Sequence, residues 1–406
     1  MYQGLKYIDE IDIRDKRVFI RADFNVPLDE HSNITDDTRI RSVLATINYA
    51  LDEKARVILA SHLGRPKGKR VLGMSLAPVA KRLTRLLDKD VVLAPDCIGT
   101  ETKNLIDRMK SGDIVLLENL RFHPEEEKND EEFGRELASF ADVYINDAFA
   151  MAHRAHASNV AITKFVKEYG AGFLMKQEIS YFSKAMDNPV RPLVAIIGGK
   201  KISDKIGVLS ALCDRVDKLV IGGGMALTFR KAQGHEVGKS FAEDNAMEEA
   251  REILKKAGEK KLKLYLPVDF VVATELSQSS ETKVVTYQEI PKDWMALDIG
   301  PATVTLFSEV LQNAKTILWN GPMGVFEIDA FSRGTFALVS SVANSFALTI
   351  VGGGDTDVAI HRAGEYAKIS YISTGGGAFL EILKGKELPG IAALCRGTAG
   401  RKAAAS

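Results

Sequence analysis

Short runs of apolar, often β-branched residues alternate along the whole chain with amphipathic segments. In the first half, segments whose apolar residues recur at helical spacing separate the runs, as at 38–53, 75–87 and 130–140. The apolar runs of this half cover 17–24, 56–61, 91–95, 113–119 and 142–149. Those of the second half begin near 193, 217, 264, 315, 348 and 370. Alternation of this kind predicts an α/β fold with doubly wound parallel sheets.

One amphipathic segment, 174–187, lies between the two halves and leads into the sequence NPVRP. It predicts a single helix that ends before the two prolines. We therefore expect two similar-sized, Rossmann-like domains, 1–173 and 188–388, joined by this helix and with a cleft between them. The last segment, 389–406, has no strand pattern, and it either returns to the first domain or frays.

Five apolar runs of the second half lead directly into glycine-rich turns. They are LVAIIGGKK (193–201), LVIGGGM (219–225), ILWNGPMG (317–324), TIVGGGD (349–355) and YISTGGGA (371–378). A buried strand followed by glycines and then a helix presents backbone N–H groups to a phosphate. Any one of these turns taken alone is better explained by glycine simply ending a strand. Five of them favour a nucleotide site along the carboxyl edge of an open sheet.

The first half carries charged and polar residues at its strand ends instead of glycine. The carboxyl ends of parallel strands share one edge of a sheet, so cationic side chains near these ends are expected to converge. Arginine suits planar, bidentate capture of carboxylate or phosphate. Two explanations compete for this set of cations. A small substrate with several negative charges explains it better than separate ion pairs with nearby carboxylates on the surface. The cationic candidates are Arg39, His62, Arg65, Arg121 and Arg154.

Charged residues among the second-half glycines supply the candidate chemistry there. Lys201 and Lys205 are four residues apart at a helix start, so they share a face. Asp355 follows three glycines and is either a helix cap or a Mg²⁺ ligand beside nucleotide phosphates. Glu327 is placed to accept hydrogen bonds from ribose hydroxyls. The pair His153 and His156 has zinc-like spacing but lacks a third ligand at suitable spacing.

Composition narrows the class of protein. Lys plus Arg and Asp plus Glu both total 54, so the net charge does not favour binding to nucleic acid or to a membrane. Three scattered cysteines and an N-terminus without an apolar signal core favour the cytoplasm. The sequence has no G-x-x-x-x-G-K-[ST] loop, no early G-x-G-x-x-G and no nucleophile elbow. Direct phosphoryl transfer between a nucleotide and a polyanion fits these features best.

With these residues assembled, the chain resembles the phosphoglycerate kinase family from end to end. The matching stretches are RADFNVP (21–27), TRI (38–40), SHLGRP (61–66), ENLRF (118–122), NDAFAMAHRAHAS (146–158), IGGKKISDKI (197–206), GGGM (222–225), DIGPAT (298–303), WNGPMGVFE (319–327), GGGDT (352–356) and STGGGAFLE (373–381). The resemblance implies reversible phosphoryl transfer from 1,3-bisphosphoglycerate to ADP with Mg²⁺, giving 3-phosphoglycerate and ATP. It also implies a tail, 389–406, that packs back on the first domain.

The resemblance also assigns residues to roles. It implies that Arg39, Lys205 and Gly376 act at the transferred group, and that Asp355 holds the metal. The implied substrate-binding residues are Asp23, Phe24, Asn25, Arg39, His62, Leu63, Gly64, Arg65, Arg121 and Arg154. The implied nucleotide-binding residues are Lys201, Lys205, Ala296, Asn320, Pro322, Glu327, Gly353, Gly354, Asp355 and Thr356. We expect a monomer in which the domains close to bring the two ligands together.

Two positions depart from the family pattern. Lys200 replaces a usual small residue and Ala296 a frequent glycine, so nucleotide affinity is the property most open to change.

Two other classes of protein compete with this interpretation. Another two-domain kinase acting on a carboxylate would share the glycine loops but not the full Arg and His set. A binding protein without activity would lose Arg39, Lys205 or Asp355, and all three are present.

Overall fold

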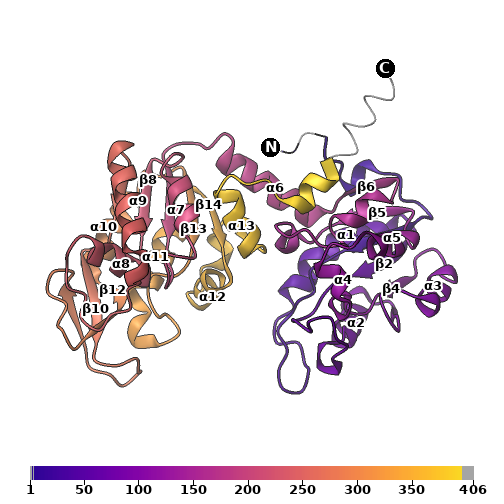
Figure 1. Cartoon of the computed structure of the whole chain (residues 1–406), viewed down its shortest axis with the longest axis horizontal. Coiled ribbons are helices and arrows are strands. Elements are labelled where there is room, and N and C mark those ends of the chain that lie inside the picture. Colours follow the sequence, from indigo (N-terminus) through magenta and orange to yellow (C-terminus); the bar gives the residue numbers. More distant parts are fainter. Residues whose placement is uncertain (1, 3, 396–406) are drawn as a thin grey trace. The chain divides into compact units, whose positions relative to one another are not determined.

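The computed structural model describes residue 2 and residues 4–395, so the expected tail segment 396–406 lies outside the described residues. The chain forms two compact units, Met1–Ser180 with Glu387–Ser406, and Tyr181–Lys386 (Figure 1). The division falls within helix α6 (Phe173–Met186), which occupies the segment predicted as one helix. No helix among the described residues is long and apolar enough to cross a membrane.

A six-stranded, all-parallel sheet forms the centre of the first unit, with the order β3-β4-β2-β1-β5-β6. Its strands are β1 (Arg17–Arg21), β2 (Arg56–Ala60), β3 (Val91–Leu93), β4 (Ile114–Leu116), β5 (Val143–Asn146) and β6 (Glu168–Ala171). Neighbouring residues Phe19 and Ile20 of β1 are both fully buried although they point to opposite faces. Both faces of the sheet are therefore covered, as expected for a parallel sheet.

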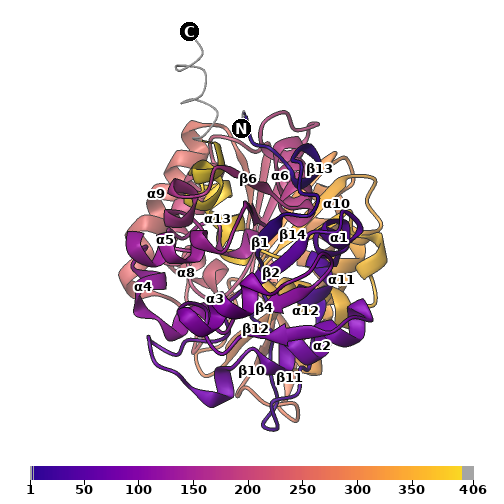
Figure 2. The ribbon, with the colours of Figure 1, turned by 90° about the vertical axis from the view of Figure 1, so that its right-hand side faces the viewer.

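Helices provide that cover. Figure 2 shows α1 and α2 on one side of the central strands and α3, α4 and α5 on the other. Their bounds are α1 (Thr38–Asp52), α2 (Ala77–Leu87), α3 (Thr100–Asp107), α4 (Pro124–Glu127) and α5 (Glu131–Ser139). Ile40, Val43 and Ile47 of α1 recur at helical spacing and are fully buried against the sheet. Asp130 begins α5 by accepting a hydrogen bond from the Phe133 N–H at 2.9 Å.

The second unit is built on another six-stranded parallel sheet, with the order β15-β14-β13-β7-β8-β9. Its strands are β7 (Leu193–Ile197), β8 (Lys218–Ile221), β9 (Lys263–Tyr265), β13 (Thr316–Asn320), β14 (Leu348–Gly352) and β15 (Tyr371–Ser373). Its helices are α7 (Ile206–Leu212), α8 (Gly224–Ala232), α9 (Met247–Glu259), α10 (Pro301–Leu311), α11 (Arg333–Ala343), α12 (Gly354–Arg362) and α13 (Gly376–Leu383). The α/β class with two parallel sheets predicted from the alternating pattern is therefore confirmed.

A small antiparallel sheet in the second unit was not predicted from the sequence. Strand β10 (Asp269–Ala273) lies between β11 (Thr282–Thr286) and β12 (Met295–Ile299), and its register with β12 shifts between Val271 and Val272. A separate apolar cluster that includes Phe270, Val272 and Leu227 of α8 packs beneath it. The sheet is thus an addition to the doubly wound core of this unit.

From Glu387 onward, shortly after α13, the chain belongs to the first unit rather than to the second. The Gly390 N–H donates to the Ala152 carbonyl at 2.9 Å, and Leu388 and Ile391 are fully buried. An added Cβ on Gly390 would lie 3.1 Å from the Ala152 Cα, so the two backbones approach closely. This return of residues up to 395 makes the first unit discontinuous in sequence.

Candidate functional sites at the strand ends

In the first unit, the loops after β1 and β2 and the first turn of α1 bring five candidate residues together. Arg39, in the first turn of α1, donates a hydrogen bond to Asp23 at 2.6 Å. The His62 Nδ1 lies 3.8 Å from the other oxygen of the same carboxylate. Asn25 accepts a hydrogen bond from the Gly64 N–H at 2.8 Å, which ties the two loops to each other. The site therefore rests on strand ends that are neighbours in the sheet.

Arg121 belongs to the same group, although it follows β4. It is only 5 % exposed, and its guanidinium donates to the Gly64 carbonyl at 2.8 Å and lies 3.3 Å from Glu127. Burial lowers the pKa of Arg121, and the nearby charges of Arg21 and Arg154 add to that effect. A cluster of cations with too few carboxylates attracts an anion.

His62 is a neutral group that lies among these cations. Burial and the charges of Arg21, Arg121 and Arg39 hold its pKa well below the usual value for histidine. The ring therefore stays uncharged near neutral pH, where it can accept or donate a hydrogen bond without adding positive charge.

The other first-unit candidates differ in how they are placed. Phe24 and Leu63 are buried, so their side chains support the loops. Arg65 is exposed and makes no hydrogen bond or ion pair with any described residue. The Arg154 guanidinium donates to the His153 ring at 3.2 Å. Arg65 is therefore the cation of this group most available to a ligand.

A buried polar network behind these loops was missed at the sequence level. Arg21 is fully buried and donates to the Ser158 hydroxyl at 2.8 Å, which in turn donates to Glu126 at 2.6 Å. The His156 Nδ1 lies 3.5 Å from the same Glu126 carboxylate. His156 therefore lies beside a carboxylate here. A charged residue inside an apolar strand, such as Arg21, is the only sequence signal for this network.

The second unit has a pocket of about 450 Å³ at the ends of β7, β13, β14 and β15. The turns that contain glycine form its walls, and Lys205 and Asp355 lie in it together. Its lining residues are Gly199, Lys200, Lys201, Asp204, Lys205, Asn320, Gly321, Pro322, Gly353, Gly354, Asp355, Thr356, Gly376 and Leu380. Four of the five glycine-rich turns that were predicted to share one edge of the sheet therefore line one pocket.

Lys205 is held firmly within this pocket. Its ammonium donates to the carbonyl of Gly198 at 2.6 Å and to that of Asn320 at 3.2 Å, so two strand-end turns fix its position. Burial lowers its pKa to about 8, although the carboxylates of Asp355 and Asp204 act in the opposite direction. A desolvated cation beside backbone N–H groups is suited to bind phosphate.

Asp355 lies in the first turn of α12, and Thr356 follows it. The Asp355 carboxylate is exposed and forms no hydrogen bond or ion pair within the described residues. Mg²⁺ binds through few carboxylates and keeps space for water and phosphate oxygens, so this carboxylate fits a Mg²⁺ site. The Thr356 hydroxyl is buried and accepts from the Gly321 N–H at 2.7 Å, which fixes the turn after β13.

Backbone geometry requires glycine at two positions in the turns around this pocket. A Cβ on Gly198 would lie 2.2 Å from the Pro322 carbonyl oxygen, so no side chain fits between these turns. Gly353 has φ +103, a conformation that other residues rarely adopt, and it precedes the first residue of α12. These glycines let the turns meet and expose their N–H groups.

Two expected nucleotide residues lie outside the pocket lining. Ala296 is in β12, where its N–H donates to Ser240 at 2.9 Å, and Glu327 is exposed after β13. Lys200 lies with its ammonium 4.7 Å from the centre of the Phe241 ring. The pocket lining also includes Asp204 and Leu380, which the sequence analysis did not single out.

The fold and the two strand-end sites define a two-unit α/β protein equipped to bind phosphorylated ligands. The family model described as "Phosphoglycerate kinase" matches residues 8–386. The phosphoglycerate kinase of Geotalea uraniireducens is 68% identical over 392 residues, which are 96% of this chain and 98% of that protein. The solved phosphoglycerate kinase of Coxiella burnetii is 42% identical with a TM-score of 0.88, covering 97% of this chain and 99% of that one.

A second solved phosphoglycerate kinase, from Pyrococcus horikoshii, is 31% identical with a TM-score of 0.85 and covers 97% of this chain and 99% of that one. The sequence and structure comparisons agree over nearly the whole length. The chain belongs to the phosphoglycerate kinase family. The resemblance inferred from the ordered stretches is therefore confirmed.

Proposed function

We propose that the protein catalyses reversible transfer of a phosphoryl group from 1,3-bisphosphoglycerate to ADP, giving 3-phosphoglycerate and ATP. Family membership supports the reaction. The glycine-walled pocket is the observation that best supports this assignment of sites. It contains both Lys205, held by two carbonyls, and the Asp355 carboxylate, which pairs with no described residue.

In this proposal the first unit binds the phosphoglycerate. The cationic cluster around Arg121 supports it, because Arg39, Arg65 and Arg154 can add bidentate contacts to phosphate and carboxylate oxygens. Neutral His62 adds a hydrogen bond. The proposed ligand contacts are completed by Asp23, Phe24, Asn25, Leu63 and Gly64, which shape the loops.

The second unit then binds the nucleotide. The phosphates occupy the pocket, where Lys201, Lys205 and the N–H groups of the turn at Gly353 and Gly354 meet them. Asp355 would hold Mg²⁺, whose charge helps to neutralise the phosphate oxygens. The remaining proposed nucleotide contacts are Ala296, Asn320, Pro322, Glu327 and Thr356.

Transfer in this account is direct and in line. Arg39 and Lys205 stabilise charge on the equatorial oxygens of the moving group, and the first N–H groups of α13 at Gly376 face it. The acceptor in the reverse direction is an ionised carboxylate, so no side chain has to remove a proton. Because Arg39 and Lys205 belong to different units, we expect closure around both ligands, which also excludes water.

The cellular location, the oligomeric state and the kind of ligand are also proposals. A cytoplasmic monomer that acts on small molecules, and not on nucleic acid or a membrane, fits the balanced charge and the three free cysteines. Size-exclusion chromatography with light scattering tests the oligomeric state.

An acceptor-dependence assay tests the proposed reaction. The purified protein is given Mg·ATP and either 3-phosphoglycerate, acetate, aspartate or no acceptor, and ADP release is followed through a coupled reaction. We expect release only with 3-phosphoglycerate. Turnover with acetate or aspartate would identify another carboxylate kinase, and no turnover with any acceptor would identify a binding protein.

A further inference from the structure

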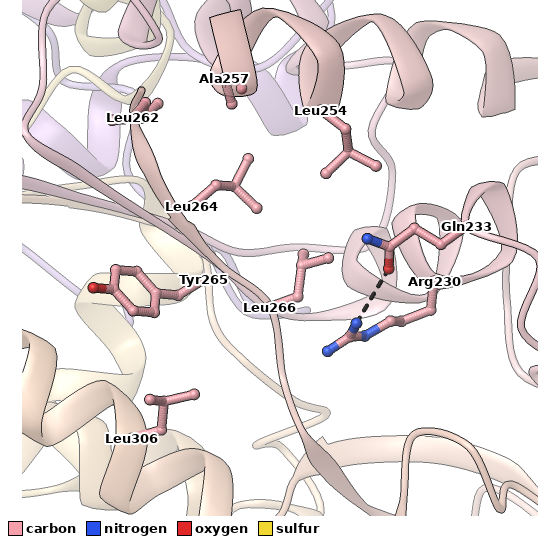
Figure 3. Close-up of a pocket in the computed structure, with 10 residues that line it drawn as sticks. Arg230, Gln233, Leu254, Ala257, Leu262, Leu264, Tyr265, Leu266 and Leu306 are labelled. Atoms are coloured by element: carbon pink, nitrogen blue, oxygen red, sulfur yellow. Dashed lines mark hydrogen bonds between the residues drawn. The ribbon is translucent and has the colours of Figure 1, made fainter. Parts of the chain in front are cut away.

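A second pocket of about 440 Å³ lies in the second unit where α8, α9, β9 and α10 meet (Figure 3). Five of its ten lining residues are leucines, including Leu254 of α9, Leu264 of β9 and Leu306 of α10. These three side chains are only partly buried, so they leave apolar surface facing the hollow. None of the residues lining it lines the glycine-walled pocket. The two pockets are therefore separate.

One cation, Arg230 of α8, is buried in the wall of this leucine-lined pocket. Its residue surface is 8% exposed, and Figure 3 shows its guanidinium beside the Gln233 amide. It donates to the Gln233 side-chain oxygen at 3.1 Å and to the Pro267 carbonyl at 2.7 Å. Its buried Nε–H has no acceptor, and no carboxylate of the described residues pairs with it.

The buried Arg230 guanidinium lacks the counter-ion and the full set of hydrogen bonds that buried charges normally have. It carries five N–H donors, of which two are used, and it has no counter-ion. The ring of Tyr287, 3.6 Å from the guanidinium carbon, offsets part of the cost of burial. Burial nevertheless lowers the pKa of Arg230, so the site favours an added negative charge.

We propose that this pocket binds an amphipathic monocarboxylate, with its carboxylate on Arg230 and its aliphatic body against the leucines. The carboxylate would supply the missing counter-charge and accept from the unused N–H groups. The aliphatic body would cover the exposed parts of Leu254, Leu264 and Leu306. A volume of about 440 Å³ lies in the range of small-molecule sites.

Octanoate and its neutral analogue octanamide are suitable probes of matched size. Each is titrated by calorimetry into the whole protein with Mg·ADP present, so that the glycine-walled pocket is occupied. We expect octanoate to bind at least about tenfold more tightly than octanamide, the scale of one charged hydrogen bond. Equal affinity, or loss of octanoate binding when Mg·ADP is present, would overturn the proposal.

Two variants locate the site. Arg230→Met keeps an apolar stem and should remove the preference for octanoate over octanamide. Lys231→Met, at the next position of α8, removes a cation that pairs with Asp244 and does not line the pocket, so it should leave that preference intact.

Leu254→Trp provides a test that leaves Arg230 in place. It fills the pocket from α9 and should abolish octanoate binding. Thermal melting of each variant shows that it is folded. A preference for octanoate over octanamide that survives in folded Arg230→Met would contradict the proposal. So would octanoate binding that survives in folded Leu254→Trp, and either folded variant alone is enough for the test.

Discussion

The Arg39 guanidinium of α1 donates to the Asp23 carboxylate, in the loop after β1, across 2.6 Å. Asp23 is 5% exposed, whereas Arg39 retains a partly exposed side chain. A buried carboxylate therefore fixes one edge of a guanidinium whose other edge remains open. This preorganises the cation proposed to meet the transferred phosphoryl group.

Replacing Arg39 with alanine should lower kcat by roughly 10²–10³-fold, the effect of removing one preorganised donor to a transition state. KM for 3-phosphoglycerate should change much less, because the contact strengthens mainly in the transition state. Steady-state kinetics measure both. Arg41→Ala is the matched control, since Arg41 lies on the same helix and pairs with Asp37. If Arg39→Ala and Arg41→Ala have similar turnover, the role assigned to Arg39 is wrong.

Nucleotide binding should take up protons at mildly alkaline pH. Burial lowers the pKa of Lys205 to about 8, so much of the free protein carries a neutral Lys205 at pH 8. Bound phosphates favour the charged form and raise this pKa, so binding takes up about half a proton at pH 8 and almost none at pH 6.

Calorimetry in buffers of different ionisation enthalpy measures that uptake. Lys205→Met should remove the contribution of the lysine while leaving that of the nucleotide itself, so the difference between the proteins isolates Lys205. Equal uptake by the two proteins at pH 8 would show that Lys205 does not titrate on binding.

Stability should depend on Asp147, which joins β5 to α1 and α6. Its buried carboxyl accepts from the Thr46 hydroxyl at 2.7 Å and from the Met175 N–H at 2.9 Å. Burial raises its pKa from 3.8 to about 7. Between these two values the folded state binds more protons than the unfolded state, so the free energy of unfolding should fall as pH rises through this window.

Asp147→Asn should flatten that part of the stability profile, measured by urea unfolding between pH 4 and pH 8. The wild-type contribution is on the order of a few kcal/mol. Asp52→Asn, at an exposed position on the last turn of α1, is the control and should keep the wild-type slope. An unchanged slope in Asp147→Asn would show that this carboxyl is already ionised across the window.

The central strands were predictable because they are buried on both faces and therefore appear as continuous apolar runs. The antiparallel strands β11 and β12 escaped prediction for the opposite reason. All of β11 except Val285 is exposed, and one of the two buried residues of β12 is Asp298, so neither is a continuously apolar strand. Strand β6 was missed because it is short and contains Gly170.

The candidate sites were predictable where backbone geometry dictates the residue, as at the turns after β7, β13, β14 and β15. Buried charges gave little signal. Arg21 stands out only as a charge in an apolar strand, and Asp147 and Arg230 have ordinary sequence neighbours, so the packing of distant segments decides that they are buried. The position of Lys205 could be predicted from its helix start, but its lowered pKa depends on the turns that enclose it.

The layout of two ligands on two units is the central claim, and calorimetric titration of each ligand alone tests it most directly. Arg65→Ala should weaken binding of 3-phosphoglycerate by about 1.5–3 kcal/mol and leave Mg·ATP binding unchanged. Asp355→Ala should leave 3-phosphoglycerate binding unchanged and remove the Mg²⁺ dependence of ATP binding. If either variant weakens both ligands equally, the two-site layout is contradicted.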